Sequence, residues 1–555
     1  MERTNKLSVV ILLNERKIPL WIFSSIERLL NSSHADVTLV VSKEPSEPSL
    51  IRKPAGAGMF LLKLVEKIDY LIFKRRDNYN LLKDIAELQT LGNFLELNTV
   101  SDFPNKIQNQ LKQVFLEIQP DLAVTFGLHC LNEELLLIPR YGIFSFSIDT
   151  GNIPGGFDYG FWEVFRYRLT SWSTVGIITN KGKQNEVIFG SMESTCPFSI
   201  NKNRNNIFYR TSLFLTRLTE GLRFNGDEYI LLQKERHNEW RNIETDVEIS
   251  VDFFKVLRDT AKYIARVSRL VINKILYTDA FSWEILINKS SDMNFPSYNF
   301  SEFKPIKSQR DLFWADPFVI SQNDRYYIFL EEFIYKTNKA HISLIELDSN
   351  GETLWQKKVI DKAYHLSYPF VFKEDGIYYM IPETASNKTI ELYRCVSFPD
   401  VWEFDRYIMR DVLATDTTLF HFDGKWWLFT TLDQTGGISG GSTELFLFFA
   451  DSPFADKWIS HPLNPIVSDE SRARCAGNLF VRDGEIYRPS QDCTMRYGRG
   501  LNFNRIIKMN ENEFIEVVID KIKPEWDSKL KGLHTFNYDD NLKIIDVYRF
   551  HRRFS

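Results

Sequence analysis

The sequence is poor in cysteine and has little excess of charge of either sign. Its 555 residues include five cysteines, 68 Lys and Arg, and 73 Asp and Glu, which gives a formal net charge of −5. A mildly acidic chain is a poor non-specific binder of nucleic acid, because attraction to phosphates requires a basic face. The five cysteines are odd in number, and their spacing fits neither a disulfide framework nor a zinc site.

The sequence also lacks a long apolar segment. The longest apolar run near the start, Leu7–Leu13, contains Ser8 and is followed by polar residues at 14–17. This run is too short for a signal-peptide core or a membrane span, so we expect a cytoplasmic protein. Residues 253–276 are basic and apolar by turns at helical spacing. This pattern favours a packing helix and leaves open peripheral contact with the inner face of a membrane.

Motifs of several common enzyme classes are absent as well. The sequence has no Asp-x-Asp pair, no serine nucleophile elbow and no metal-binding pair of histidines. The glycine-rich segment at 436–442 lacks the lysine and the strand-to-helix context of a phosphate loop, so we interpret it as a loop on the rim of the second domain. We therefore expect neither a cofactor nor a metal.

Aromatic residues, in contrast, make up 14% of the chain and favour strands. At roughly 150 residues per domain, the length suggests two to four domains. In residues 1–198, apolar strands such as Val9–Leu13 and Val37–Val41 alternate with amphipathic helices such as Ile18–Leu30. This alternation predicts a doubly wound α/β sheet. Residues 199–280 have helical periodicity and little strand signal, which indicates a helical connector.

Residues 281–555 contain a unit that recurs five times. Each unit has an apolar segment, a short turn and a second strand that is mostly aromatic or apolar, and three of the turns are Asp-Gly pairs, at 375, 423 and 483. Asp-Gly between alternating strands is the strongest short-range signal of a hairpin. Hairpins that repeat about every 50 residues predict a β-propeller, here with five blades. The strand at 283–288 would complete the last blade and close the ring.

Equivalent positions of the five units should meet at the central channel of the propeller. The units start at Asp316, Tyr368, Asp416, Ala476 and His534, and the positions 15 residues later hold Glu331, Glu383, Thr431, Gln491 and Arg549. Clustered carboxylates raise one another's pKa, and a pair of them performs glycosyl chemistry as acid and as base or nucleophile. We therefore predict a catalytic set of Asp316, Asp416, Glu331 and Glu383.

A second set of side chains is predicted to bind the substrate. Arginine forks match phosphates and sugar acids, and histidines suit hydroxyls. The predicted binding residues are Trp314, His365, Arg474, Arg488, Asp492 and His534. Structural roles remain open for all of these positions: the arginines and Asp492 equally suit a salt-bridge network, and an Asp before Pro317 equally suits a turn cap.

The propeller region carries sequence runs of a known family. Between about residues 300 and 520 these are, in order, FWADPFV, HLSYPFVF, YYMIPET, ELYRCVSFPDVW, DTTLF, WWLF, DSPF, YRPSQDC and YG. They resemble the N-terminal propeller domain of plant glucosamine inositolphosphorylceramide transferases, whose fold is similar to that of furanosidase-type glycoside hydrolases. The resemblance implies acids on the inner strands, and Asp316 matches the Asp-Pro of the first blade. The glycosyltransferase domain of the plant proteins does not follow here, so their transfer activity is not carried over directly.

Residues 121–190 resemble the formyltransferase fold, which uses a formyl-folate cofactor. The matching runs are DLAVTFG, YGIFSFSID, PGGFDYGFWEVF and NEVIFG. Active members need Asn and His to stabilise an oxyanion and Asp to steer proton transfer. The matching positions hold Ser145, Ser147 and Lys183 instead, so we expect this domain not to formylate.

The sequence thus predicts a multidomain chain with a formyltransferase-like α/β domain (1–198), a helical connector (199–280) and a five-bladed β-propeller (281–555). We expect a carbohydrate-active protein of glycan or glycolipid biosynthesis that transfers or cleaves a glycosyl unit of a sugar or glycolipid substrate. One alternative is a non-catalytic module that binds a glycan or a glycolipid headgroup. The other is a sugar N-formyltransferase whose propeller binds the acceptor. Fold alone does not decide among them.

Overall fold

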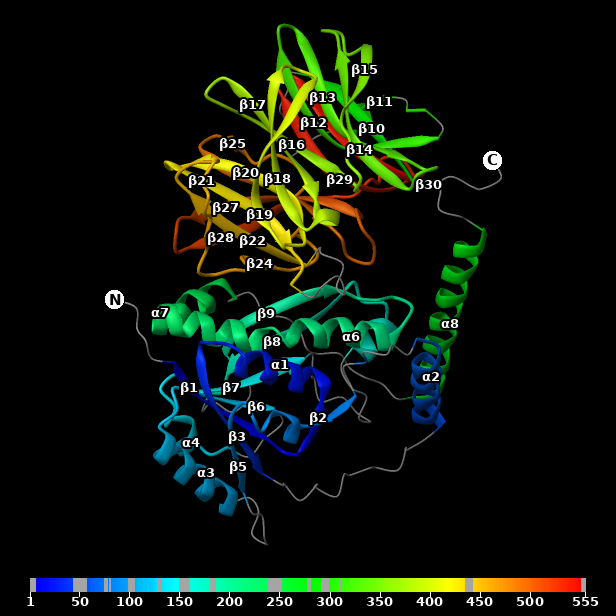
Figure 1. The fold of residues 1–555 in the computed structure, drawn as a ribbon. Coiled ribbons are helices and arrows are strands. Elements are labelled where there is room, and N and C mark those ends of the chain that lie inside the picture. Colours follow the sequence, from blue (N-terminus) through cyan, green and yellow to red (C-terminus); the bar gives the residue numbers. More distant parts are fainter. Residues whose placement is uncertain are drawn as a thin grey trace. The chain divides into compact units, whose positions relative to one another are not determined.

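The computed structural model describes most of the chain as two compact units, residues 1–268 and 269–555 (Figure 1). The described residues are 6–42, 57–73, 78, 81–97, 105–126, 131–148, 160–179, 186–237, 252–276, 281–290, 299–306, 308–309, 311–434 and 443–550. The glycine-rich segment and Lys183 lie outside these ranges.

The first unit is built on a seven-stranded sheet in the order β5-β3-β1-β6-β7-β8-β9. Its strands are β1 (Leu7–Leu13), β3 (Ala35–Ser42), β5 (Asn93–Leu97), β6 (Leu122–Phe126), β7 (Ile143–Ile148), β8 (Thr170–Ile177) and β9 (Glu186–Ser194). Five strands run parallel, and β8 and β9 pair antiparallel at one edge. Strands of a parallel sheet that is covered by helices on both faces consist almost entirely of apolar residues, and the central strand β1 has this composition. The unit is an α/β domain, as the alternating pattern predicted.

The helices of this unit include those of the predicted connector. They are α1 (Leu20–Leu30), α2 (Ala57–Phe73), α3 (Asn105–Ile118), α4 (Glu133–Leu136), α5 (Phe161–Phe165), α6 (Ile200–Thr211), α7 (Phe214–Arg236) and α8 (Phe253–Leu276), beside a small ladder of β2 (Lys17–Pro19) and β4 (Leu82–Asp84). Helices α6 and α7 and the first two thirds of α8 belong to the first unit. None of the helices in the described ranges is both long enough and apolar enough to cross a membrane.

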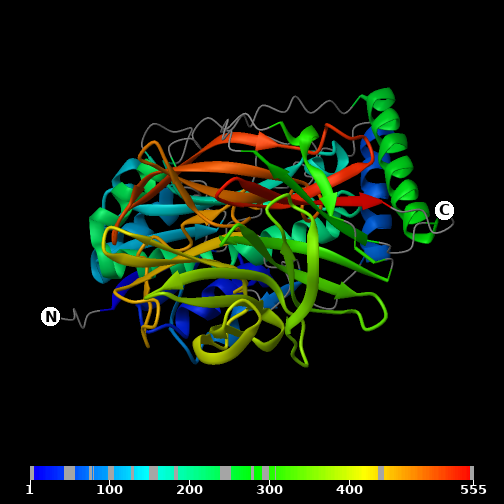
Figure 2. The ribbon, with the colours of Figure 1, turned by 90° about the horizontal axis from the view of Figure 1, so that it is seen from above.

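The second unit consists of five antiparallel sheets, the blades of a β-propeller (Figures 1 and 2). The first blade is β12 (Leu312–Gln322), β13 (Arg325–Ile334), β14 (Lys339–Leu347) and β15 (Thr353–Ile360). The second is β16 (Ser367–Glu374), β17 (Ile377–Thr384), β18 (Thr389–Ser397) and β19 (Val401–Arg410). The third is β20 (Ala414–Phe422), β21 (Lys425–Leu432), β22 (Glu444–Ala450), β23 (Ile459–Ser460) and β24 (Val467–Ser468). The fourth is β25 (Phe480–Arg482), β26 (Glu485–Asp492), β27 (Gly500–Met509) and β28 (Phe514–Ile522).

The fifth blade closes the ring with strands from both ends of the unit. It is formed by β29 (Leu530–Asp539), β30 (Leu542–Phe550), β10 (Phe281–Lys289) and β11 (Lys304–Ile306). Strand β10 pairs antiparallel with β30, from Phe281 opposite Phe550 to Lys289 opposite Leu542. The predicted closure by the early strand is therefore confirmed, and it removes the open edges of a linear array.

A bulge recurs near the start of four innermost strands. The strand register shifts between residues 315 and 318, 367 and 370, 415 and 418, and 533 and 536. In the first three blades the residue inside the bulge has a positive φ: 50° at Asp316, 41° at Tyr368 and 50° at Asp416. Bulges of this kind re-aim a side chain. They turn the unit-start residues toward the neighbouring blades.

The fifth unit departs from the predicted spacing of 15 residues. In the first blade, Glu331 pairs with Ala315. The corresponding pair in the fifth blade is Val547 with Leu533, because the fifth hairpin is one residue pair shorter. Arg549 lies two residues further on and pairs with Glu284 and Asp527 instead.

We expect Gly477→Ala to destabilise the propeller by ~3 kcal/mol. Its φ is +127°, and an added Cβ would lie 2.1 Å from the backbone oxygen of Phe536 in the next blade. Gly424→Ala is the matched control, because φ there is +71° but nothing lies within 4 Å of an added Cβ. Chemical denaturation of the two variants measures the difference, and equal losses of stability would contradict the close packing at Gly477.

Candidate functional site

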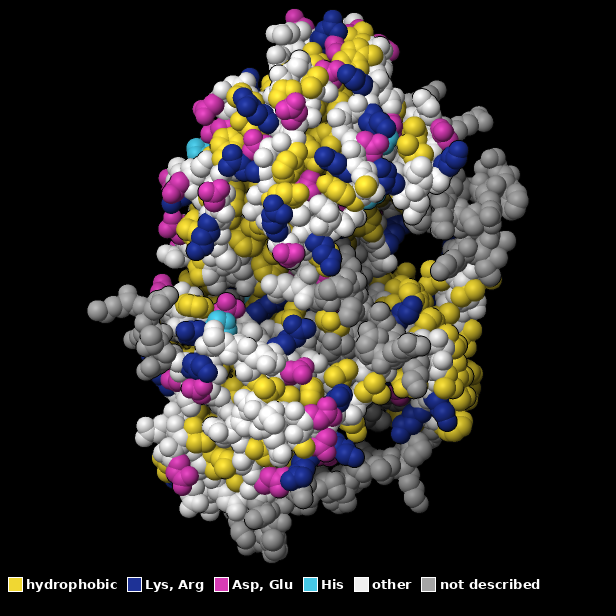
Figure 3. All heavy atoms as spheres, in the orientation of Figure 1, with side chains coloured by type: hydrophobic (Ala, Val, Ile, Leu, Met, Phe, Trp, Pro, Cys, Tyr) yellow, Lys and Arg dark blue, Asp and Glu magenta, His cyan; other side chains and the backbone are white. Residues whose placement is uncertain are grey.

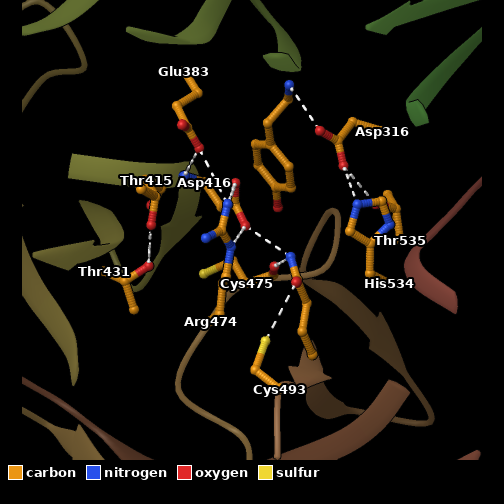
Figure 4. Close-up of polar contacts among 12 residues, drawn as sticks. Asp316, Glu383, Thr415, Asp416, Thr431, Arg474, Cys475, Cys493, His534 and Thr535 are labelled. Atoms are coloured by element: carbon orange, nitrogen blue, oxygen red, sulfur yellow. Dashed lines mark hydrogen bonds and ion pairs between the residues drawn. The ribbon is translucent and has the colours of Figure 1, made fainter. Parts of the chain in front are cut away.

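A buried ionic cluster links the first and fifth blades. The His534 ring lies between two carboxylates, with Nδ1 2.7 Å from Asp546. Its Nε2 lies 3.4 Å from Asp316 (Figure 4). Asp316 also accepts hydrogen bonds from the Thr535 hydroxyl at 3.0 Å and from the Tyr368 backbone N–H at 3.2 Å. These contacts join residues of three blades around one imidazole.

A second cluster links the second, third and fourth blades. The Arg474 guanidinium donates to both oxygens of Asp416, at 2.6 and 3.2 Å, and to Glu383 at 3.4 Å (Figure 4). Gln491 donates to Asp416 at 2.8 Å, and the Asp416 backbone N–H donates to Glu383 at 3.3 Å. Asp416 therefore accepts three side-chain hydrogen bonds from one neighbouring blade.

A third pair bridges the first two blades at a more open position. His365 Nε2 lies 3.3 Å from Glu331, while its Nδ1 accepts the Ala340 backbone N–H. The Nδ1 bond leaves the proton of a neutral ring on Nε2, facing the carboxylate. The His365 side chain is 34% exposed.

Aromatic rings complete the site. Trp283 stacks on His534 with ring centroids 3.9 Å apart, and Tyr497 meets the same imidazole edge-on at 5.1 Å. Tyr497 also lies 4.8 Å from the Arg474 guanidinium and is 45% exposed. The buried Tyr368 hydroxyl bonds to Thr418 and Gly477, so its ring joins three blades.

The environments of the carboxyl groups differ strongly. Burial raises the pKa of Asp316 to about 7, although the charge of His534 opposes the shift. Burial and the nearby Asp416 charge hold the pKa of Glu383 well above its usual range. The pKa of His534 is raised to about 9: burial disfavours its charge, but the carboxylates of Asp546 and Asp316 outweigh burial. Two carboxyl groups therefore have raised pKa values beside ion-paired partners.

The structure separates the predicted site residues into two groups. It brings together Asp316, Asp416, Glu331, Glu383, His365, Arg474 and His534 through the contacts above. Trp314 lies elsewhere, because its indole N–H donates to Glu332, which faces away from Glu331 on the adjacent pleat. Trp314 is therefore not part of this cluster, and its predicted role in binding stays a prediction.

Arg488 and Asp492 also lie outside the cluster. Arg488 is fully buried, and its donors bond to Glu516 and to the backbone oxygens of Arg472 and Ala473. A ligand would have to displace these partners to reach Arg488, so the structure favours the salt-bridge alternative for this residue, and its binding role stays a prediction. Asp492 caps its own loop, accepting bonds from the Thr494 backbone and hydroxyl.

Sequence reasoning missed three members of the cluster. Asp546, Trp283 and Tyr497 contact His534 but were not among the predicted residues. Asp546 is the only acid inside the strand pattern of β30, and an acid within a buried strand was the available signal. Asp316, His534 and Asp546 also have the atom types and spacing to hold a metal, but the raised pKa of His534 favours imidazolium between the two carboxylates.

The first unit supplies little of its predicted site. Ser145 lies on β7 in the central part of the sheet. The side chain of Ser147 and all of Lys183 are outside the described residues. The geometry of the formyl-transfer positions therefore adds nothing to the sequence comparison.

Residues 305–550 match the family described as "Glucosamine inositolphosphorylceramide transferase 1, N-terminal". The glucosamine inositolphosphorylceramide transferase 1 of Oryza sativa subsp. japonica is 37% identical over 212 residues, which are 38% of this chain and 28% of that protein. The Arabidopsis thaliana protein is 33% identical over 229 residues, which are 40% of this chain and 29% of that protein. The chain thus spans under a third of the length of these relatives. The resemblance of the propeller region to this family is confirmed.

Two solved structures of glycoside hydrolases are similar to this chain at low identity. Zg3597, a family 117 glycoside hydrolase of Zobellia galactanivorans, is 11% identical with a TM-score of 0.32 over 49% of this chain and 92% of its own. The catalytic domain of the Coprinopsis cinerea GH62 α-L-arabinofuranosidase is 11% identical with a TM-score of 0.32 over 45% and 95%. No chemistry is inferred from either similarity.

We expect the propeller to lose stability as the pH rises from about 6.5 through 9. The pKa of His534 is about 9 in the folded chain, whereas that of an ordinary histidine is 6.5, so the folded state keeps a proton that the unfolded chain releases. The stabilisation is complete below pH 6.5, lost above 9, and on the order of 3 kcal/mol. Urea denaturation across this range measures it. In His534→Gln the pH dependence should flatten, and an unchanged slope would contradict the assignment.

Proposed function

We propose that this chain serves glycan or glycolipid assembly and that its propeller binds a sugar-bearing polar headgroup at the outer end of the ionic cluster. The family match supports the class, because the matching relatives are named as transferases of a glucosamine inositolphosphorylceramide. The proposal concerns recognition of the headgroup before any catalysis. We place the chain in the cytoplasm, as we expected from the short apolar run near its start.

The exposure gradient across the cluster carries this proposal. The side chains of Asp316, Asp416 and His534 are 2–4% exposed and ion-paired between blades. The outer side chains remain in reach of a ligand: Glu331 is 10%, Arg474 12%, Glu383 14% and His365 34% exposed. The inner acids therefore support the ring, and the outer side chains are the ones that lie within reach of a ligand.

The outer groups suit a phosphorylated sugar. The Glu331 carboxylate accepts hydrogen bonds from hydroxyls, and the partly exposed His365 ring can donate to a hydroxyl or to a phosphate oxygen. The Arg474 fork is held by Asp416 and Glu383, so this residue shapes the rim of the site beside Tyr497. The exposed ring of Tyr497, beside Arg474, offers an apolar surface on which a sugar ring can rest.

We expect Tyr497→Ala and His365→Ala each to weaken binding of a glucosaminyl-inositol phosphate about tenfold, which corresponds to ~1.4 kcal/mol. Both side chains are exposed enough for the variants to keep the fold. Isothermal titration calorimetry measures the affinity, with inositol phosphate alone as the comparison ligand. Lys457→Ala is the control, because this exposed propeller residue lies outside the cluster, and it should bind like the wild type. No binding to the wild type, or equal losses in the control, would reject the proposal.

Glycosyl transfer or hydrolysis is the second candidate, and the raised pKa of Glu383 favours it. A carboxyl group whose pKa is raised by burial and by a nearby acid keeps its proton more readily than a free one and can donate it to a leaving oxygen. Asp316, with a pKa of about 7, is the deeper candidate for the base or nucleophile. Its 4% exposed side chain would require the ring to open toward the substrate, which is why binding stands first.

If the chain is such an enzyme, Glu383→Gln should lower turnover by roughly 10²–10⁴-fold while leaving substrate affinity nearly unchanged. Release or transfer of a radiolabelled sugar from a glycolipid measures turnover, and calorimetry measures affinity. Wild-type protein that binds the headgroup without any turnover would exclude the catalytic candidate and leave the binding proposal intact.

The alternative of sugar N-formylation rests on the first domain alone. The resemblance of that domain to formyltransferases remains a prediction, as does its inactivity from the changes at Ser145, Ser147 and Lys183. A role in placing a substrate or a partner is the function we propose for it.

A further inference from the structure

Helices α2 and α8 of the first unit leave a broad set of large apolar side chains exposed. We call this set, within residues 57–268, the apolar face. Its members are Phe60, Leu64, Ile68, Leu71 and Ile72 on α2 and Phe253, Phe254, Leu257 and Ile264 on α8. Their exposed fractions run from 40% at Phe253 to 75% at Phe254. Single exposed apolar residues are ordinary, but a contiguous set marks an interaction surface.

The apolar face is separate from the surface that holds the two helices together. Met59, Leu62 and Val65 of α2 share one buried cluster with Val256 and Tyr263 of α8, and the cluster also includes residues of α5 and α6. The Tyr263 hydroxyl also donates to the buried Asp69 at 3.1 Å. The helices lie side by side in both ribbon views (Figures 1 and 2). Packing therefore uses one stripe of each helix, and a second apolar stripe is left over.

Arg266 fixes α8 in this position. Its guanidinium donates to the backbone oxygens of Pro197 and Val164 and lies 4.7 Å from the Tyr167 ring. This arginine is thus committed to the unit itself. The exposed apolar stripe of α8 is therefore presented by a helix that is anchored through its opposite side.

Basic side chains border the apolar face. Lys63 and Lys67 on α2, and Lys255, Arg258 and Lys262 on α8, are all exposed. At 100° per residue, those of α8 form a stripe next to Phe254 and Leu257. Within the described ranges, no acidic side chain pairs with the four lysines, whereas Glu66 is paired with Arg204. Figure 3 shows yellow side chains gathered over α2 with dark blue ones beside them.

We propose that this surface docks on an anionic membrane, with the apolar face in the headgroup boundary and the lysines on the lipid phosphates. An apolar stripe beside a basic stripe is the pattern of helices that lie in a membrane interface. The excess of unpaired positive charge points to an anionic lipid surface, since a second copy of the same basic surface would be repelled. Lysine stems can lie along apolar surface while their charges stay in water.

The test is co-sedimentation of the full chain with vesicles. Vesicles of phosphatidylcholine containing a third of phosphatidylserine should bind the protein, and vesicles of phosphatidylcholine alone should bind it at least about tenfold more weakly. Raising the salt concentration should weaken the binding, because salt screens charges at the surface. Failure of the wild-type chain to bind the anionic vesicles would overturn the proposal.

Two sets of variants separate the charged and apolar contributions. Reversing four charges, in Lys63→Glu, Lys67→Glu, Lys255→Glu and Lys262→Glu together, should lower binding about 100-fold or more at low salt. Phe254→Ser with Leu71→Ser should lower it about tenfold. All of these side chains are exposed, so the folded unit should persist, and circular dichroism checks this.

Matched substitutions in the propeller are the controls. Lys457→Glu with Lys523→Glu, and Leu354→Ser with Ile459→Ser, change exposed residues of the same types away from the two helices. They should leave vesicle binding unchanged. Equal losses in test and control variants would overturn the assignment of the surface. So would a wild-type dimer, seen by light scattering, that Phe254→Ser with Leu71→Ser converts to a monomer, because a second copy would then cover the face. Neither outcome depends on the headgroup proposed for the propeller.

Discussion

The propeller depends on the balance of charge along its channel. Three carboxylates of this region, Asp316, Asp416 and Asp546, are almost completely buried, and isolated buried charges would cost several kcal/mol each. His534 and Arg474 pair with them, and in every case the cation and at least one of its acids come from different blades. Closing the ring brings His534 to Asp316, and the packing of consecutive blades brings Arg474 to Asp416. The packing of the blades and the pairing of their charges are therefore two aspects of one constraint.

This constraint explains why acids on inner strands have two different uses. Asp416 meets a guanidinium fork and an amide, so its bonding capacity is used within the protein. Glu331 meets one histidine at the open end and retains capacity for a ligand. Residue type at an equivalent repeat position does not distinguish these cases. The depth of the side chain in the channel distinguishes them, because it decides whether a carboxylate bonds to another blade or faces the solvent.

Much of the fold followed from local sequence signals. Asp-Gly turns and alternating strands predicted the hairpins, because turn geometry and strand period are encoded within a few residues. The channel cluster followed from repeat position. Arg488 and Trp314 lie outside this cluster, which their sequence positions did not indicate, because their partners, Glu516 and Glu332, are chosen by packing between strands. The shorter fifth hairpin was not predicted either, because the loss of one residue pair leaves the alternating strand pattern unchanged.

The two units differ in the kind of surplus that their own packing leaves for a partner: polar groups in the propeller and apolar groups in the first unit. In the propeller the surplus is polar and lies at the open end of a charge-balanced channel, where binding a hydroxylated or phosphorylated headgroup would use it. In the first unit the surplus is apolar, on two helices whose packing stripes are already filled. A lipid with a phosphorylated sugar headgroup presents both chemistries, because its headgroup is polar and the membrane that carries it is apolar beneath its phosphates. The two kinds of surplus are therefore complementary to two parts of one class of molecule.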